Sequence, residues 1–392
     1  MQNCDPFREI TALVSFGESH IDTGNLYTLT SFLWPPATWP KRYFNGGRFT
    51  NGPVFVEQLA TKLQVPLYNF AFSAATSHNM IRGYTGPEGT TAVPSLNEQI
   101  SHHFHRALIK KPSHVIESSL SRLSFHDYLS SSNLKSSGSL VTPETSNNQH
   151  QKSSNSLVLP ESSHTTLAEA SSKSSLTFSD VPAPNIGIPP NSMPIDVSST
   201  LFVLTCGGND HYFNHSSHNC EISVETIVNN VLELVKTLQT VYGAKKIVVF
   251  NCQDFARQPN RGSPIKEGTA KEHNRIIERR FRELFGDGSQ VNGFVKLFDL
   301  CSTIDEIMDD PGRFGVKNVS DAFVGYGGQL APDDANPNDY LWWDNWHFTE
   351  PIHQIIADGI AKQATKSLPP LPKKVWTERP VDPSSRFNNT NQ

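Results

Sequence analysis

The sequence predicts an α/β fold, a three-layer α/β/α sandwich built on a mainly parallel sheet. The first observation is a set of short apolar runs rich in β-branched and aromatic residues, typical of buried parallel strands. These runs are residues 13–16, 201–205, 247–250 and 294–298. The second observation is a helical period in the segments between them. Strands that alternate with helices are joined by right-handed crossovers, which place helices on both faces of one sheet.

The helical segments follow from the spacing of apolar residues. Within 224–238, 276–285 and 352–360 these residues recur every three or four positions, which is the period of one helix face. In open parallel sheets, ligands bind beyond the carboxyl ends of the strands. We therefore expect functional side chains just after Phe16, Thr205 and Phe298.

Composition and charge exclude some classes of partner. The chain has 392 residues, with 33 basic and 38 acidic side chains and a formal net charge of −5. It has no block of lysine and arginine of the kind that binds nucleic acid or anionic membranes. No apolar run approaches the roughly 18 residues that span a bilayer. We expect a soluble protein with neither a nucleic-acid partner nor an integral membrane segment.

One domain with an insertion is the predicted organisation. Residues 114–199 contain about two dozen serines and few aromatic residues, a composition typical of disorder. The helix that ends before this segment would join directly to the strand that follows it, so we interpret 114–199 as a surface insertion or translated intron sequence. We predict a single domain over 1–368 with this insertion, and a proline-rich extended tail over 369–392.

The N-terminus and the cysteines bear on the compartment. Asp5, Arg8 and Glu9 stand where a signal peptide needs an apolar segment. The expected location is cytoplasmic if this N-terminus is complete, and extracellular if a signal peptide is missing from the gene model. The five cysteines show no CxxC pair and no metal-ligand spacing. This favours reduced thiols, and leaves two disulfides with one free thiol as the alternative.

Four polar residues predict the chemistry. Ser19 follows the first strand, and Asp344 stands three residues before His347. A serine hydroxyl becomes an effective nucleophile beside a base that takes its proton, and imidazole suits that role. A carboxylate on the other ring nitrogen fixes the tautomer of the imidazole. Asn209, in the Gly-Gly-Asn-Asp turn after the second strand, offers an amide that can donate to an oxyanion.

Other polar clusters predict less. His102, His103 and His105 lack a neighbouring carboxylate or cysteine, so we assign them to a solvated helix face and expect no metal. No phosphate loop or dinucleotide fingerprint occurs, so we expect no cofactor. The tryptophans could form an aromatic rim around a site; they are Trp34, Trp39, Trp342, Trp343 and Trp346.

Taken in order along the chain, these segments resemble the GDSL-type, or SGNH, family of serine esterases and acylhydrolases, above all its plant-like and fungal branch. The resemblance runs from about residue 13 to residue 362, interrupted by the serine-rich segment. The blocks that carry it are FGESHIDTGN (16–25), GRFTNGPVFVEQLA (47–60), NFAFSAATS (69–77), GGND (207–210) and DNWHFT (344–349).

The resemblance implies an SGNH-type fold and a carboxylic ester hydrolase that works through a Ser-His-Asp acyl-enzyme mechanism. It makes Ser19 the nucleophile, His347 the general base and acid, and Asp344 the carboxylate that orients His347. It places the oxyanion hole at the backbone N–H groups of Ser19 and Ala74 and the side-chain amide of Asn209. It implies neither a metal nor a cofactor.

Two departures from the family pattern qualify this expectation. Glu18 replaces the usual aspartate before the nucleophile, and Ser73-Ala74 replaces the usual pair of glycines. We expect hydrolysis with reduced activity or with a restricted range of substrates. The expected substrate is a small-molecule, lipid or acetylated-glycan ester. The alternatives are a catalytically impaired SGNH-fold protein that binds an ester or glycan, and a defective gene model. Acyl length and oligomeric state stay open.

Overall fold

The computed structural model describes residues 10–30, 45–85, 91–108, 193–216, 222–259, 263–290, 293–325 and 328–365. The chain divides into one compact unit of residues 1–109 with 184–392, and a second, residues 110–183, which lies outside the described ranges. In the described ranges no helix is long and apolar enough to cross a membrane.

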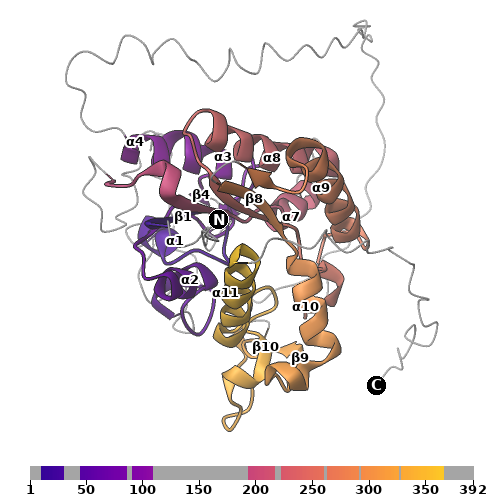
Figure 1. The fold of residues 1–392 in the computed structure, drawn as a ribbon. Coiled ribbons are helices and arrows are strands. Elements are labelled where there is room, and N and C mark those ends of the chain that lie inside the picture. Colours follow the sequence, from indigo (N-terminus) through magenta and orange to yellow (C-terminus); the bar gives the residue numbers. More distant parts are fainter. Residues whose placement is uncertain are drawn as a thin grey trace, which may run out of the picture. The chain divides into compact units, whose positions relative to one another are not determined.

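A six-stranded sheet forms the centre of the first unit (Figure 1). Its order is β2 (Leu67–Asn69), β1 (Ala12–Phe16), β5 (Thr200–Leu204), β6 (Lys246–Phe250), β8 (Gly293–Phe298) and β7 (Ser289–Gln290). All neighbours are parallel except β7, which is antiparallel to β8. The predicted α/β fold is therefore confirmed. The sequence did not reveal β2 and β7, because strands of three and two residues are too short to form an apolar run.

Helices cover one face of the sheet through a shared apolar core. These are α2 (Phe55–Leu63), α10 (Leu300–Asp309) and α11 (Glu350–Thr365), and α11 packs against α2. Alternate strand side chains, Leu13 and Val203 among them, point into this core. The predicted helix over 352–360 is thus part of α11, whereas α2 and α10 were not predicted.

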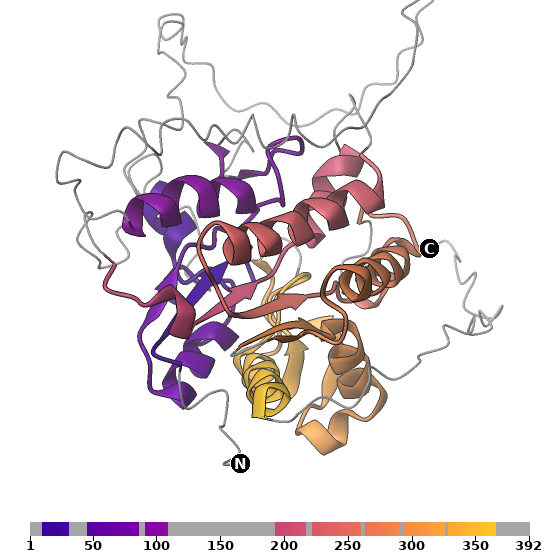
Figure 2. The same ribbon diagram turned by 45° about the horizontal axis from the view of Figure 1, so that its top comes forward.

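Other helices cover the opposite face. They are α3 (Leu96–Glu98), the π-helical turn η2 (Gln99–Phe104), α4 (His105–Leu108), α8 (Val224–Thr240) and α9 (Thr269–Phe285). Figure 2 shows α8 and α9 on the other side of the sheet from α10 and α11. The predicted helices over 224–238 and 276–285 are confirmed. The structure begins α9 at Thr269, and the prediction missed its first turns because they carry few apolar residues.

Short elements complete the described part of the chain. They are α1 (Asn25–Thr30), η1 (Asn45–Gly47), β3 (Tyr84–Thr85), β4 (Thr91–Ala92), η4 (Val197–Ser199), α7 (Gly208–Ser216), η5 (Phe255–Arg257), η6 (Pro311–Phe314), β9 (Asn318–Ala322), η8 (Pro337–Asp339) and β10 (Tyr340–Trp342). The parallel pair β9–β10 leads the chain into α11.

The serine-rich segment returns to the domain earlier than predicted. Met193 is 4% exposed, its backbone N–H donates to the carbonyl of Ala107 at 2.8 Å, and Ile195 and Val197 pack against the same core. The prediction of disorder is therefore wrong for residues 193–199, whose apolar side chains have a core to join. The rest of the predicted insertion, 114–192, and the predicted tail, 369–392, lie outside the described residues.

Candidate active site

The turn that carries Ser19 is held by backbone contacts. At Gly17, with φ 151°, a Cβ atom would lie 2.2 Å from the carbonyl oxygen of Thr205, so this position needs glycine. The buried amide of Gln99 accepts from the Gly17 N–H at 2.8 Å and donates to the Gly17 carbonyl at 2.9 Å. The loop after β1 is therefore fixed from two sides before any substrate binds.

Asp22 ties this loop to the 69–77 block. Its fully buried carboxylate accepts the N–H groups of Gly24, Asn25 and Leu26, and that of Ser73 at 2.7 Å. Burial raises the pKa of Asp22 to about 6, although the four hydrogen bonds act in the opposite direction. A local turn thus sets the position of Ser73 relative to Ser19.

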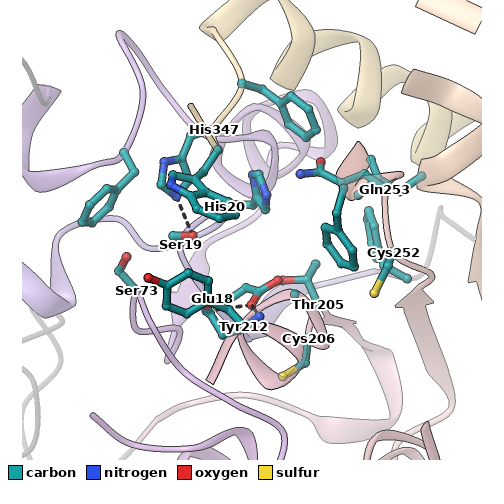
Figure 3. A pocket seen from close by; sticks show the side chains of 18 of the residues that line it. Glu18, Ser19, His20, Ser73, Thr205, Cys206, Tyr212, Cys252, Gln253 and His347 are labelled. Carbon is teal, nitrogen blue, oxygen red and sulfur yellow. Dashed lines mark hydrogen bonds between the residues drawn. The ribbon is translucent and has the colours of Figure 1, made fainter. Parts of the chain in front are cut away.

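The structure places Ser19, His347 and Asp344 in one hydrogen-bonded row. His347 Nε2 lies 2.8 Å from Ser19 Oγ (Figure 3). His347 Nδ1 lies 2.8 Å from each carboxylate oxygen of Asp344. Asp344 Oδ1 also accepts the backbone N–H groups of Trp346 and His347 at 2.9 Å. The three-residue spacing therefore does bring the carboxylate to the imidazole, in a turn that the same carboxylate closes.

His20 forms a wall behind His347. Its ring stacks on Phe348 with centroids 4.8 Å apart and meets His347 edge to face at 5.4 Å. Burial, and then the charge of a protonated His347, hold the pKa of His20 well below its usual value. His20 is consequently neutral and leaves the charge of the row unchanged.

Ala74 has a left-handed backbone. Its φ is 67°, and a Cβ on Gly83 would lie only 1.8 Å from its carbonyl oxygen, so Gly83 packs directly on this peptide. A non-glycine residue in this region costs about 1–2 kcal/mol. Ser19 and Ala74 both line the same cavity. Position 74 therefore has a backbone conformation that favours glycine, the residue usual there in the family pattern.

Asn209 turns its amide toward Glu18. The Nδ2 atom lies 2.8 Å from Glu18 Oε2 and 3.0 Å from the carbonyl oxygen of Ala75. These two hydrogen bonds use both hydrogens of the Asn209 amide. Burial, and then the charge of Asp210, raise the pKa of Glu18 to about 8. In this arrangement the predicted oxyanion donor is already hydrogen-bonded within the protein.

Asp210 holds the neighbouring loop. Its buried carboxylate accepts the Ser77 backbone N–H and the Ser77 hydroxyl, the latter at 2.5 Å, and burial raises its pKa to about 6. The sequence pattern predicts no role for Gln99, Asp22 or Asp210. Asp22 lies three residues after Ser19 and Asp210 directly after Asn209, both within the motifs quoted above. This closeness in sequence could have indicated that the two aspartates belong to the site. Gln99 had no signal, since it is one of several polar residues in its helix.

A cavity of about 330 Å³ opens beside Ser19. Of the predicted tryptophan rim, Trp346 lines it and meets Tyr212 edge to face at 5.5 Å. Trp342 and Trp343 are buried instead. Trp34 and Trp39 lie outside the described residues.

Histidines also gather behind the site. His211, Cys252 and His273 are buried, with possible ligand atoms within 4.8 Å of one another. His211 Nε2 and His273 Nδ1 lie 3.0 Å apart, a hydrogen-bond distance, and burial lowers the pKa of His273 to about 4. The sequence did not predict this cluster. Of the predicted solvated histidines, His103 is half-buried, with its ring 6.0 Å from that of Phe72.

An α/β fold with serine, histidine and aspartate in one hydrogen-bonded row is typical of serine hydrolases. The family model described as GDSL-like Lipase/Acylhydrolase matches residues 123–360, more than half of the chain. The chain belongs to this family, as the sequence resemblance predicted. The match begins after the segment that holds Ser19.

Similar proteins include two plant esterases/lipases and a bacterial hemolysin. GDSL esterase/lipase 5 of Arabidopsis thaliana is 24% identical over 193 residues, covering 42% of this chain and 49% of the relative. GDSL esterase/lipase ENOD8 of Medicago truncatula is 22% identical, covering 92% and 87%. The thermolabile hemolysin of Vibrio parahaemolyticus is 31% identical, covering 26% and 22%. The chain thus spans about half the length of several relatives that it matches.

Proposed function

We propose that this protein hydrolyses carboxylic esters, with Ser19 as the nucleophile, His347 as general base and acid, and Asp344 as the carboxylate that orients His347. The observation that carries the proposal is the hydrogen-bonded row, with 2.8 Å on each side of the imidazole. Family membership supports ester hydrolysis, and the geometry supports these three residues in particular.

The reaction proceeds in two transfers. His347 Nε2 takes the Ser19 proton as Oγ bonds to the ester carbonyl carbon, and then gives that proton to the departing alcohol oxygen as the ester bond breaks. Water next attacks the acyl-enzyme, with His347 again as base, and the carboxylic acid leaves as Ser19 recovers its proton. Asp344 stabilises the imidazolium that forms at each stage.

The oxyanion in both steps would be stabilised by the backbone N–H groups of Ser19 and Ala74. The Asn209 amide joins them when it turns from Glu18 and Ala75, so this third donor is conditional. One such donor contributes about 3–4 kcal/mol to the transition state in comparable enzymes. Slow turnover is therefore part of the proposal.

The runner-up is a catalytically impaired protein that binds an ester or a glycan. Two observations favour it: the engaged amide of Asn209, and the left-handed backbone of Ala74. The intact row from Ser19 to Asp344 favours the enzyme.

Labelling and hydrolysis separate the two candidates. A serine-directed phosphonate should add its mass to the Ser19 peptide, and aryl esters graded from acetyl to palmitoyl should be hydrolysed by the wild type but not by Ser19→Ala. Absence of both labelling and Ser19-dependent hydrolysis, with retained binding of an ester or glycan, would establish the impaired binder instead.

A further inference from the structure

The cavity beside Ser19 has a carbon-rich inner wall. It continues past the carboxyl ends of β5, β6 and β8. Its inner side chains are at most 9% exposed: Phe250, Cys252, Phe255, Leu300 and Ile356. Burying the apolar surface of a ligand against such a wall is favourable, and the gain grows with each methylene buried. An alkyl chain is therefore the group that this space suits.

Polar groups in the wall are few or already paired. Asn251 donates its amide to Asp299 at 2.9 Å and accepts the Cys301 N–H at 3.1 Å. Four polar atoms of lining residues have no hydrogen-bond partner within the described part of the chain: Thr205 Oγ1, Gln253 Oε1, Gln258 Oε1 and His20 Nδ1. A sugar ring presents hydroxyl groups around its whole edge, and burying them without partners is unfavourable. These four atoms are fewer than the oxygens of a single hexose ring, so most of the polar groups of a buried glycan would lack partners.

Volume limits the length of the chain. At roughly 30 Å³ per methylene, close to the volume of one liquid water, a cavity of about 330 Å³ corresponds to a chain of about eleven carbons. An acetyl group would leave most of this space unfilled. A palmitoyl chain exceeds this volume, so part of it would lie outside the cavity.

We propose that this cavity binds the acyl group of the substrate, that it prefers a saturated chain of roughly six to ten carbons, and that Cys252 and Leu300 set this length. The proposal rests on the proposed ester hydrolysis at Ser19, since the cavity begins there. The carbonyl carbon lies at Ser19, and the chain runs toward Leu300 at the start of α10. The alcohol side of the ester lies outside the cavity.

Filling the cavity is the first test. Methionine is flexible and fills irregular space, so Cys252→Met should shorten the preferred chain. We expect the ratio of kcat/KM for p-nitrophenyl decanoate to that for the butyrate to fall roughly tenfold. Cys301→Met is the matched control, because Cys301 is equally buried, 4% exposed against 5%, and does not line the cavity. Its ratio should stay at the wild-type value.

Enlarging the cavity is the second test. It does not depend on the first, so it can be carried out even if Cys252→Met does not fold. Leu300→Ala should raise kcat/KM for the laurate relative to the octanoate roughly tenfold. Leu297→Ala is its control: both leucines are 7% exposed, and Leu297 lies on the other sheet face, outside the cavity. A laurate-to-octanoate ratio that does not differ between the two variants would overturn the proposal.

Failure of the pocket differs from failure of the enzyme. Ser19-dependent hydrolysis that is fastest for acetate, with a profile insensitive to Cys252→Met and Leu300→Ala, leaves an esterase without this acyl pocket. If no ester is hydrolysed, calorimetry with sodium octanoate on Ser19→Ala decides: binding that Leu300→Ala weakens but Leu297→Ala does not supports the pocket alone. No octanoate binding would overturn it.

Discussion

The side-chain amide of Asn209 donates to the carboxylate of Glu18 at 2.8 Å. Glu18 precedes Ser19 in the sequence, and its side chain is one methylene longer than that of the aspartate usual at this position in the family. A second amide hydrogen goes to Ala75 at 3.0 Å. The donor on which the third oxyanion contact depends is thus held by the residue that departs from the family pattern.

Removal of either reacting side chain should abolish hydrolysis. Ser19→Ala and His347→Ala should each lower kcat by about 10⁴-fold or more, and the double variant should be no slower, because both act in one proton transfer. Steady-state kinetics on an aryl ester measures this, with circular dichroism to verify the fold. Ser101→Ala, outside the cavity, is the serine control. Wild-type turnover by Ser19→Ala would show that another residue is the nucleophile.

Glycine at position 74 should help both stability and rate. Ala74 has φ 67°, which glycine adopts without the penalty of a Cβ. We expect Ala74→Gly to raise kcat/KM by roughly 3- to 30-fold, and the gain to appear mainly in kcat, because the donor acts on charge present only in the transition state. Tm should not fall. A change confined to KM for bulky acyl groups would mean that the methyl group shapes the pocket instead.

A shorter carboxylate at position 18 should release Asn209. Glu18→Asp withdraws the acceptor by one methylene, and we expect kcat/KM to rise roughly 3- to 30-fold as the amide becomes available. Glu18→Gln is the control for length, since its amide oxygen still reaches Asn209. Equal gains in kcat/KM for Glu18→Asp and Glu18→Gln would show that the length of side chain 18 is not the cause, and that the charge of the Glu18 carboxyl group is.

Stability should depend on pH through Glu18. Its carboxyl has a pKa of about 8 when folded against 4.5 for the free group, so between these values the folded state binds more protons than the unfolded state. Stability therefore falls as pH rises through this window. Asp22 and Asp210, each with a pKa raised to about 6, act with the same sign at lower pH.

Glu18→Gln should remove the part of this slope near neutrality. We expect its Tm to fall less than that of the wild type between about pH 6.5 and 8.5, measured by calorimetry across that range. The exposed Glu267→Gln variant is the control and should keep the wild-type slope. A slope unchanged in Glu18→Gln would show that this carboxyl titrates normally.

The serine-rich segment should be removable up to residue 192 and no further. The Met193 N–H bonds to Ala107 at 2.8 Å, so the two ends of the segment 109–192 leave the domain close together and a short Gly-Ser linker can join them. Deleting 114–192 should leave Tm within a few degrees of the wild type. Deleting 114–198 also removes buried Met193, with an expected loss of about 2–5 kcal/mol. Equal unfolding midpoints in urea would show that 193–198 adds nothing.

Local patterns carried much of the fold. The strands β1, β5, β6 and β8 were predicted because parallel strands covered on both faces are continuous apolar runs. Much of α8 and α11 was predicted from one apolar face. β2 was not predicted because three partly buried residues are too few to show a periodic apolar pattern. Residues 193–199 were assigned to the disordered insertion because the composition was judged over the whole serine-rich segment, which hid the apolar residues near its end.

By itself, the sequence determined which side chains were available for chemistry: a serine after the first strand, an Asp-x-x-His pair, and an Asn after two glycines. Only the tertiary structure brought His347 within 2.8 Å of Ser19, since the two lie 328 positions apart and meet through the sheet and α11. The structure likewise decided that the Asn209 amide faces Glu18 and that Gln99 holds Gly17. The physical reason is that a hydrogen bond depends on distance and direction in space, which strand order and helix packing fix, whereas a sequence pattern records only neighbours along the chain.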